Sequence, residues 1–202
     1  MRLSFYEHIK RLIDLFISLV LILFTLPLQL ILYFSIAITL RGNPLFIQER
    51  GVTLTNKRFR IIKFRTIAAN HKKKPYEEFH EKKNHEDINA FGKFLRWSGL
   101  DELPQLYNVV SGKMSLIGPR PLMIDDLNHL KENHIDFYKQ REKIKSLPGI
   151  TGYWQINRKK DLSANKLIEL DSYYEANKSF TLDAKILFRT AVIMFTFSNN
   201  RH

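Results

Sequence analysis

Two adjacent carboxylates, Asp101 and Glu102, lie in a dense polar stretch that runs from Ser98 to Tyr107. Neighbouring residues do not share a helix face, so the two side chains can point about 100° apart and take different tasks, one at a reacting atom and one at a metal ion. A bare Asp-Glu pair is also common at an exposed helix N-terminus, where the helix dipole favours acids. The cations elsewhere in the chain favour the chemical interpretation.

Arg120 is the first of these cations, because it lies between Pro119 and Pro121. Prolines on both sides restrict the backbone and so aim one side chain at low entropic cost. Arginine is also the residue best suited to bind phosphate oxygens in a bidentate manner. The motif therefore predicts a phosphate contact, with an incidental turn as the alternative.

Lys63 and Arg65 flank Phe64 in a second basic segment, and Arg96 precedes the carboxylate pair. If Phe64 faces the core of a strand, both neighbouring cations face away from it together. A solvated strand face explains Lys63 and Arg65 equally well. The clustering of guanidinium groups near an acidic pair nevertheless indicates an anionic, phosphorylated substrate.

The composition limits the classes of function. The chain has 202 residues, a net charge of +12 and no cysteine. Such a charge implies an anionic partner, namely nucleic acid, anionic lipid or a phosphorylated substrate. Without cysteine there is neither a disulfide framework nor a thiolate nucleophile. The seven histidines lack metal-ligand spacing, and no Gly-rich phosphate loop or nucleophile elbow is found.

A long apolar run from Leu15 to Leu40 indicates a membrane element. It exceeds the core of a signal peptide, and a single transmembrane span needs about 20 apolar residues. Basic residues flank both ends, which favours keeping both ends in the cytoplasm. Pro27, near the middle, would interrupt a helix. We therefore predict that residues 1–40 form a membrane-embedded re-entrant helical hairpin and residues 41–202 a cytoplasmic catalytic domain at the membrane surface.

The expected fold class is α+β: a mostly helical monotopic membrane protein with a small β-hairpin and interfacial amphipathic helices. Two strands are predicted at 45–48 and 58–65, and a surface loop at 70–89. The other expectations are a helix from Phe91 to Gly112, extended chain at 115–121, one or two helices at 122–146, a turn at 148–152, and helices at 162–177 and 182–197, the last lying in the membrane interface. Asp14 is expected to pair with Lys10 or Arg11.

Several blocks, in order along nearly the whole chain, resemble the bacterial sugar transferase family, the small monotopic polyprenyl-phosphate phosphoglycosyl transferases. The blocks are Lys10-Arg11-x-x-Asp14, Gly42 to Gly51, Phe59-x-x-x-Lys63-Phe64-Arg65-Thr66, Leu95-Arg96, Asp101-Glu102-Leu-Pro-Gln-Leu106, Met114 to Pro121, and Pro148-Gly-Ile-Thr-Gly152.

The resemblance implies transfer of a sugar 1-phosphate from a UDP-sugar to polyprenyl (undecaprenyl) phosphate, with release of UMP and a requirement for Mg²⁺. It implies a bacterial enzyme of glycoconjugate or polysaccharide biosynthesis at the cytoplasmic face of the inner membrane. By position, Asp101 would be the nucleophile and Glu102 the Mg²⁺ ligand. The expected substrate-binding residues are Lys63, Arg65, Arg96, Arg120, Arg158, Lys159 and Asp171.

The chain departs from the family pattern in two places. Lys113 stands where the family usually has aspartate, and Arg158-Lys159 stands where it has Gly-Arg. The family arginine is thus replaced by Lys159 or shifted to Arg158. Trp154, at a variable family position, is expected to shape the sugar or nucleotide pocket. The competing interpretations are an inactive scaffold and a module that binds anionic membranes or nucleic acid, whereas the enzyme interpretation excludes nucleic acid. The sugar and the oligomeric state, a dimer included, stay open.

Overall fold

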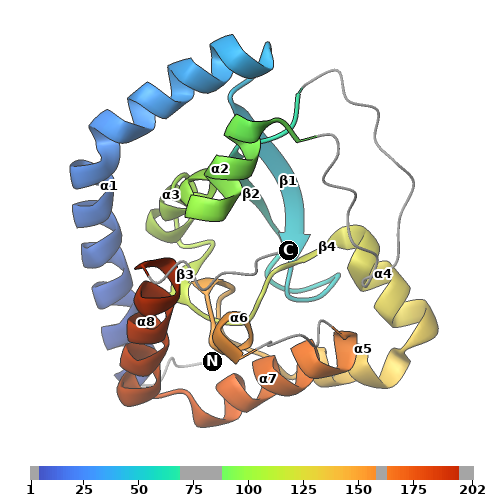
Figure 1. Ribbon diagram of the computed structural model, residues 1–202. Coiled ribbons are helices and arrows are strands. Elements are labelled where there is room, and N and C mark those ends of the chain that lie inside the picture. Colours follow the sequence, from blue (N-terminus) through green and yellow to red (C-terminus); the bar gives the residue numbers. More distant parts are fainter. Residues whose placement is uncertain (1–4, 69–87, 158–162, 196–202) are drawn as a thin grey trace.

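The computed structural model describes residues 5–68, 88–157 and 163–195 of the chain (Figure 1). Most of its elements are helices, and its strands form a three-stranded antiparallel sheet, β2-β1-β4, and a two-stranded parallel sheet, β3-β5. The predicted mostly helical fold with a small sheet is confirmed. The elements are α1 (Phe5–Leu40), β1 (Leu45–Gly51), β2 (Phe59–Phe64), α2 (Ala90–Ser98), η2 (Leu100–Glu102), α3 (Gln105–Val110), β3 (Ser115–Ile117), β4 (Leu122–Met123), α4 (Ile124–Asn133), α5 (Ile135–Glu142), β5 (Gly149–Thr151), α6 (Tyr153–Asn157), α7 (Ala164–Asn177) and α8 (Phe180–Phe195).

The β-hairpin of β1 and β2 confirms the predicted pair of strands. Its register pairs Leu45 with Phe64 and Arg50 with Phe59. Phe59 and Ile61 of β2 are buried in one cluster, whereas Phe64, on the other face of the strand, is buried in a second cluster with side chains of α1 and α2. Both faces of β2 are therefore partly covered, and Lys63 shares a face with Phe59 and Ile61.

The apolar N-terminal run is one helix of 36 residues, so the expected break between two helices is wrong. Pro27 lies inside α1, and Figure 1 shows the helix changing direction part-way along its length. A proline removes one backbone hydrogen bond and bends a helix without necessarily ending it. Around Pro27, Thr25 Oγ1 donates to the carbonyl of Leu21 (2.6 Å) and accepts from Gln29 Nε2 (2.9 Å). These bonds connect the successive turns across the bend.

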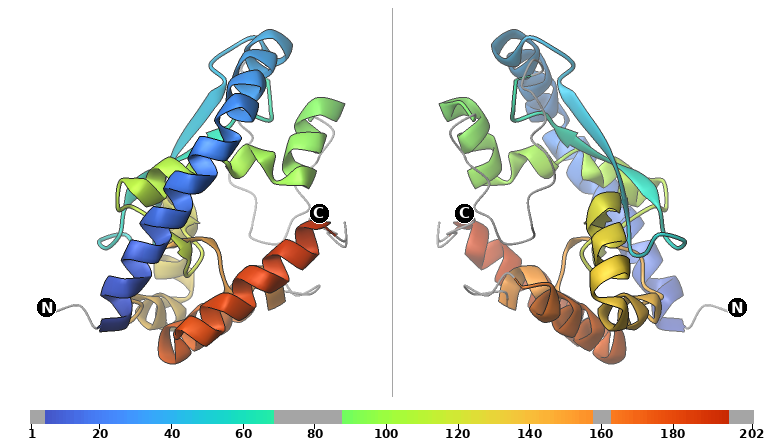
Figure 2. Two further views of the ribbon diagram at one scale, coloured as in Figure 1. Left: turned by 90° about the vertical axis from the view of Figure 1, so that its left-hand side faces the viewer. Right: turned by 90° about the vertical axis from the view of Figure 1, so that its right-hand side faces the viewer.

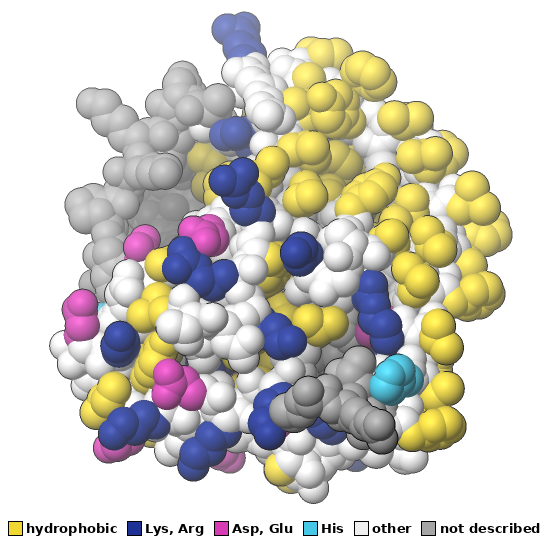
Figure 3. Space-filling view, turned by 180° about the vertical axis from the view of Figure 1, so that it is seen from behind, with side chains coloured by type: hydrophobic (Ala, Val, Ile, Leu, Met, Phe, Trp, Pro, Cys, Tyr) yellow, Lys and Arg dark blue, Asp and Glu magenta, His cyan; other side chains and the backbone are white. Residues whose placement is uncertain are grey.

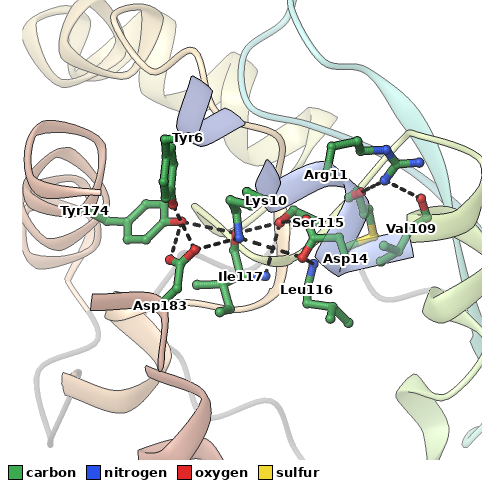
Figure 4. A network of polar contacts seen from close by, with 11 residues as sticks. Tyr6, Lys10, Arg11, Asp14, Val109, Ser115, Leu116, Ile117, Tyr174 and Asp183 are labelled. Carbon is green, nitrogen blue, oxygen red and sulfur yellow. Dashed lines mark hydrogen bonds and ion pairs between the residues drawn. The ribbon is translucent and has the colours of Figure 1, made fainter. Parts of the chain in front are cut away.

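A network of polar side chains docks the first turns of α1 onto the rest of the protein (Figure 4). Asp183 of α8 accepts a hydrogen bond from Tyr6 (2.8 Å) and forms an ion pair with Lys10 (2.9 Å). Asp14 accepts from Ser115 Oγ (2.6 Å) and lies 3.8 Å from Lys10 Nζ, which confirms the predicted pairing. Lys10 and Asp14, the charged residues beside the apolar run, are thus paired within the protein.

Arg11, by contrast, serves the end of another helix. Its guanidinium donates to the carbonyls of Val109 (2.7 Å) and Val110 (3.2 Å) at the C-terminus of α3. The last carbonyls of a helix have no partner within the helix, and a cation there also complements the helix dipole. Arg11 therefore ties α1 to the helix that follows the Asp101-Glu102 pair.

The second half of α1 packs on a different part of the same domain. Leu32, Ile36 and Leu40 form a buried cluster with Phe64 of β2 and Leu95 of α2. Both ends of α1 thus contact one folded unit. Figure 2 shows α1 and α8 meeting near the N-terminal end of α1 and diverging from there.

The segment from Phe91 to Gly112 is not the single helix that its periodicity suggested. Gly99 ends α2 with a φ of +73°, and the short 3-10 helix η2 and then α3 follow. This left-handed conformation suits glycine, which has no Cβ. Pro104 lies at the start of α3, where a missing N–H costs nothing. Gly99 and Pro104 therefore separate η2 from α2 and from α3.

The predicted turn at 148–152 is instead the strand β5, which pairs in parallel with β3. Three glycines let the two backbones cross closely. A Cβ on Gly118 would lie 2.2 Å from the carbonyl oxygen of Leu147, and one on Gly149 or Gly152 would lie 2.1 Å from backbone atoms of Gly118. A non-local pairing of this kind has no signal in the local sequence.

The remaining helices confirm the predictions for 122–146, 162–177 and 182–197 within one or two residues at most ends. In Figure 1, α4 and α5 lie on the side of the molecule away from α1, and α7 runs along the bottom edge between α8 and α5. They enclose a core that contains Leu122, Leu127, Leu130, Tyr138, Trp154, Leu167, Ile168 and Leu170. The predicted loop at 70–89 lies almost wholly outside the described residues.

Candidate active site

The Asp101-Glu102 pair lies on η2, between the ends of α2 and α3. Successive residues of a 3-10 helix project about 120° apart. Asp101 is accordingly buried, at 8% exposure, whereas the side chain of Glu102 is 35% exposed. The two carboxylates therefore face different surroundings, as the sequence predicts.

Lys63 is joined directly to this pair. Its Nζ lies 2.8 Å from Glu102 Oε1. Asn108 of α3 sets the register of this contact, because its Oδ1 accepts from the N–H of Ile62 (3.0 Å) and its Nδ2 donates to the carbonyl of Arg60 (2.9 Å). Asn108 thus bonds the open edge of β2 as a neighbouring strand would.

Arg96 interacts electrostatically with Asp101. Burial lowers the pKa of the Arg96 guanidinium below its ordinary value, and the charge of Asp101 acts in the opposite direction. Arg96 Nε also donates to Thr66 Oγ1 (2.9 Å), which fixes the side chain between α2 and the end of β2. The buried carboxylate of the pair therefore has a guanidinium as its electrostatic neighbour.

Arg120 lies in the segment between β3 and β4, and its guanidinium carbon stands 4.8 Å from the ring centre of Trp154. Trp154 is 5% exposed, so a buried indole ring forms the cation–π contact with the guanidinium of Arg120. Trp154 packs in the buried core beside α4, α5 and α7, and its ring also contacts the Arg120 guanidinium. Whether the indole also shapes a sugar or nucleotide pocket stays a prediction.

Arg50 is a further cation at this site that the sequence analysis did not single out. Its Nε and Nη2 donate to Gln48 Oε1 (3.0 and 2.7 Å), and its Nη1 donates to the carbonyl of Pro121 (3.5 Å). Burial, and to a lesser extent the charge of Arg120, lowers the pKa of Arg50 to about 10, while Asp126 and Glu102 act in the opposite direction. Arg50 lies inside the Gly42–Gly51 block that resembles the family, and this position could have identified it from the sequence.

Asp171 differs from the other candidates because it is completely buried, at 0% exposure. Its Oδ2 accepts from Arg141 Nη1 (3.0 Å) and from the backbone N–H of Arg120 (3.1 Å). In this structure the carboxylate has no exposed surface with which to contact a substrate. Arg141, also 0% exposed, was missed because a single arginine in a charged helix gives no local signal.

Of the three remaining predicted substrate contacts, Arg65 is the one that lies within the described residues. Arg65 Nε donates to the carbonyl of Asn43 (2.7 Å), at the start of the β-hairpin. Arg158 and Lys159 lie outside the described residues. Which of these two replaces the family arginine stays a prediction.

The donors present fit a magnesium ion only together with substrate oxygens. Among residues 5–68, 88–157 and 163–195, no group of three or more histidine, aspartate or glutamate side chains could hold a metal. Mg²⁺ is commonly bound by one or two carboxylates plus substrate phosphates and water. The partly exposed carboxylate of Glu102, with one oxygen toward Lys63, suits such a shared site.

Together these elements form a site in which the two carboxylates have cationic neighbours, Arg96 for Asp101 and both Lys63 and Arg50 for Glu102. Residues 5–197 match the family model described as Bacterial sugar transferase. The chain therefore belongs to the bacterial sugar transferase family, as the resemblance of its motifs indicates.

Curated relatives agree. The chain is 32% identical over 201 residues to the undecaprenyl-phosphate galactose phosphotransferase of Salmonella typhimurium, covering 93% of this chain and 40% of the relative. It is 38% identical over 181 residues to the uncharacterized sugar transferase EpsL of Bacillus subtilis, covering 89% and 83%. A glucose-1-phosphate transferase of Xanthomonas campestris that is named for UDP-glucose and undecaprenyl phosphate is 34% identical, with 94% and 39% covered. The chain thus spans about 40% of the length of several relatives.

Proposed function

We propose that this protein transfers a sugar 1-phosphate from a UDP-sugar to undecaprenyl phosphate and releases UMP. The names of the Salmonella and Xanthomonas relatives support a sugar-phosphate donor and this lipid carrier. The single structural observation that carries the proposal is the divergent carboxylate pair on η2, with Lys63 at 2.8 Å from Glu102 and Arg96 beside Asp101. A diphosphate needs cations, and a two-step transfer needs a nucleophile, and both are present here.

Asp101 is the proposed nucleophile. Its carboxylate oxygen attacks the phosphorus that bears the sugar, and the bond from that phosphorus to the bridging oxygen breaks, so that UMP leaves with the electron pair. An oxygen of undecaprenyl phosphate then attacks the same phosphorus and the Asp101 carboxylate departs. Arg96 stabilises the carboxylate before attack and after departure.

Glu102 is the residue that would hold Mg²⁺ together with the substrate diphosphate. The ion, when bound, neutralises phosphate charge and so makes UMP a better leaving group. Lys63, Arg50 and Arg120 supply fixed positive charge for the same oxygens. Arg120 has the planar fork that suits bidentate phosphate binding.

The apolar surface supports action at a membrane. Within the part of the chain that the structure describes, one helix, α1, is long and apolar enough to cross a bilayer, and 17% of its most apolar window is buried. Figure 3 shows apolar side chains gathered along the α1 side, with lysines and arginines beside them. Both ends of α1 contact one domain, so we propose that the bent helix enters and leaves the same leaflet, at the cytoplasmic face of the bacterial inner membrane, with α8 in the interface.

The decisive experiment is the intact mass of the protein after incubation with UDP-sugar and Mg²⁺ in the absence of the lipid acceptor. We expect a gain equal to one sugar phosphate on the wild type and none on Asp101→Asn, because an amide is a poor nucleophile. Glu102→Gln is expected to lose activity and to recover part of it at raised Mg²⁺. UMP formation that depends strictly on the acceptor, with no adduct, would contradict the covalent route.

The same assay separates the competing functions. An inactive scaffold, or a module that only binds anionic membranes or nucleic acid, releases no UMP from any UDP-sugar. A panel of UDP-sugars is needed, because the relatives' names differ between galactose and glucose. The UDP-sugar with the highest kcat/KM for UMP release identifies the donor.

A further inference from the structure

The backbone of Arg120 is held by a buried ion pair that reaches it from two helices. Asp171 of α7 accepts the Arg120 N–H (3.1 Å). Arg141 of α5 donates its Nη2 to the Arg120 carbonyl and its Nη1 to Asp171 Oδ2 (3.0 Å). Both backbone hydrogen-bonding groups of Arg120, its N–H and its carbonyl, are therefore bound by one ion pair, and both charged side chains are fully buried.

The neighbouring prolines leave the segment with few backbone hydrogen-bonding groups, so each bond to Arg120 matters more. Pro119 and Pro121 have no N–H, so Arg120 provides the one backbone donor of the three residues. The carbonyl of Pro119 accepts from the N–H of Gly149 (3.0 Å) and that of Pro121 accepts from Arg50 (3.5 Å). Every backbone hydrogen-bonding group from residue 119 to 121 is thus held by another element.

The side chain of Arg120 is fixed separately by Trp154, over whose ring the guanidinium lies at 4.8 Å. The ion pair fixes the position of the Arg120 backbone, and the indole fixes the position of its guanidinium group. A long side chain normally loses rotamer freedom when it binds a ligand, and that loss weakens binding. Holding both ends beforehand removes much of this cost.

We propose that Arg141 and Asp171 are positioning residues that act through Arg120, holding it against Trp154 so that its guanidinium is preorganised for an anionic phosphate. This inference rests on the proposed function for the phosphate, but the position of Arg120 does not. Arg141 also donates Nε to the carbonyl of Val52 (2.6 Å), beside the end of β1. The ion pair therefore ties the Arg120 segment to the β-hairpin that carries Lys63.

The test uses the fluorescence of Trp154. The chain has two tryptophans, so Trp97→Phe leaves Trp154 as the single emitter. Indole emission responds to a cation held against the ring. In this background we expect Arg120→Met to change the emission, Asp171→Asn to change it in the same direction, and the double variant to add nothing. This readout requires neither substrate nor turnover.

An unpaired buried charge can unfold a protein, so a second variant protects the test. Arg141→Gln combined with Asp171→Asn removes both charges and keeps polar groups of similar size. It should also reproduce the Arg120→Met emission, with a far-ultraviolet circular dichroism spectrum like that of the parent. Arg58→Gln, which breaks the exposed Arg58–Glu49 pair (2.7 Å), is the control and should leave Trp154 emission unchanged. Folded variants of the ion pair that keep the parental emission would overturn the proposal, as would an Arg120→Met protein with unchanged emission.

Kinetics then connect the position to the proposed reaction. If Asp171 acts through Arg120, Asp171→Asn should lower kcat/KM for UMP release about tenfold or more in the wild type but less than about twofold in an Arg120→Lys background. Equal losses in the two backgrounds would overturn the positioning role. A wild type without UMP release would overturn the proposed function alone, since the fluorescence result is independent of it.

Discussion

At the scale of single residues, the site depends on side chains that bond backbone groups as much as on those that would meet a substrate. Asn108, Arg11 and Arg141 each bind backbone atoms of another element. Their common effect is to hold η2, β2 and the Arg120 segment in one arrangement. Preorganised charge of this kind contributes to catalysis because it needs no rearrangement during the reaction.

Arg120→Lys keeps the charge but loses the planar fork that binds two phosphate oxygens. We expect kcat/KM for UMP release to fall about 10- to 150-fold, since loss of one charge-assisted hydrogen bond costs roughly 1.5–3 kcal/mol. The measurement is the rate at sub-saturating UDP-sugar. Arg189→Lys, at an exposed position on α8, is the matched control. Full activity of Arg120→Lys would mean that the residue is structural.

Asn108→Ala removes the side chain that bonds the edge of β2 at Ile62 and Arg60. Each of the two buried groups left without a partner costs about 1–3 kcal/mol, so at about 2–4 °C per kcal/mol for a protein of this size we expect the melting temperature to fall by roughly 4–24 °C. Activity should fall as well, because Lys63 neighbours Ile62. Asn128→Ala, at an exposed position on α4, should change neither property. An unchanged melting temperature would show that water replaces the amide.

At the scale of elements, local patterns predicted what local interactions determine. The two apolar segments around a turn at 51–56 predicted both strands, and the i, i+4 spacing predicted the Lys10–Asp14 pair. Three other predictions were wrong, and the break expected in the apolar run is one of them. The residues around Gly99 keep a helical period although the chain turns there, and β5 exists only because β3 lies beside it. The sequence of a single segment does not reveal a pairing with a distant strand.

Lys178 links the start of α1 to the end of α7, through Glu7 (3.2 Å) and Glu175 (2.9 Å). Burial tends to lower the pKa of this amine, but the hydrogen bond and charge of Glu175, and those of Glu7, raise it above its ordinary value of 10.5. A raised pKa in the folded state means that the stabilisation is complete below the unfolded pKa and is lost as pH rises through the folded one.

The melting temperature of Lys178→Met should therefore lie below that of the wild type by a constant amount from neutral pH to about 10, and the difference should shrink at higher pH. Thermal unfolding in detergent across this range measures it. Lys166→Met, which breaks the more exposed Lys166–Glu169 pair on α7, is the control. A difference that persists unchanged to the highest pH would exclude titration of Lys178 as the cause.

At the scale of the whole molecule, much of the candidate site could be predicted from the sequence, but its supports could not. Asp101, Glu102, Lys63, Arg96 and Arg120 stand in short blocks with local constraints, such as flanking prolines. Asp171 was predicted as a substrate contact, whereas its observed pairing with Arg141 spans 30 residues of sequence and leaves no local pattern. Pro27 predicted an interruption of the apolar run, but α1 continues through it, and Thr25 and Gln29 form hydrogen bonds near the proline.

The contacts of α1 also restrict how the molecule meets a membrane. Its first turns bind Asp183 and Ser115, and its last turns pack against Phe64 and Leu95. A helix whose two ends contact one domain cannot place them on opposite sides of a bilayer while those contacts persist. Its central apolar side chains, including Leu23 at 70% and Phe24 at 79% exposure, remain for the lipid.

We therefore expect both ends of α1 to face the cytoplasm. Because the chain has no cysteine, single cysteines at His8 and Asn43 can be labelled without background by a membrane-impermeant reagent. Both should react only after the cells are permeabilised, like a control cysteine at Thr55 in the turn between β1 and β2. Labelling of either α1 flank, but not of Thr55→Cys, in intact cells would establish a transmembrane span. In that case the docking of the first turns of α1 on Asp183 could not exist in the membrane-bound protein.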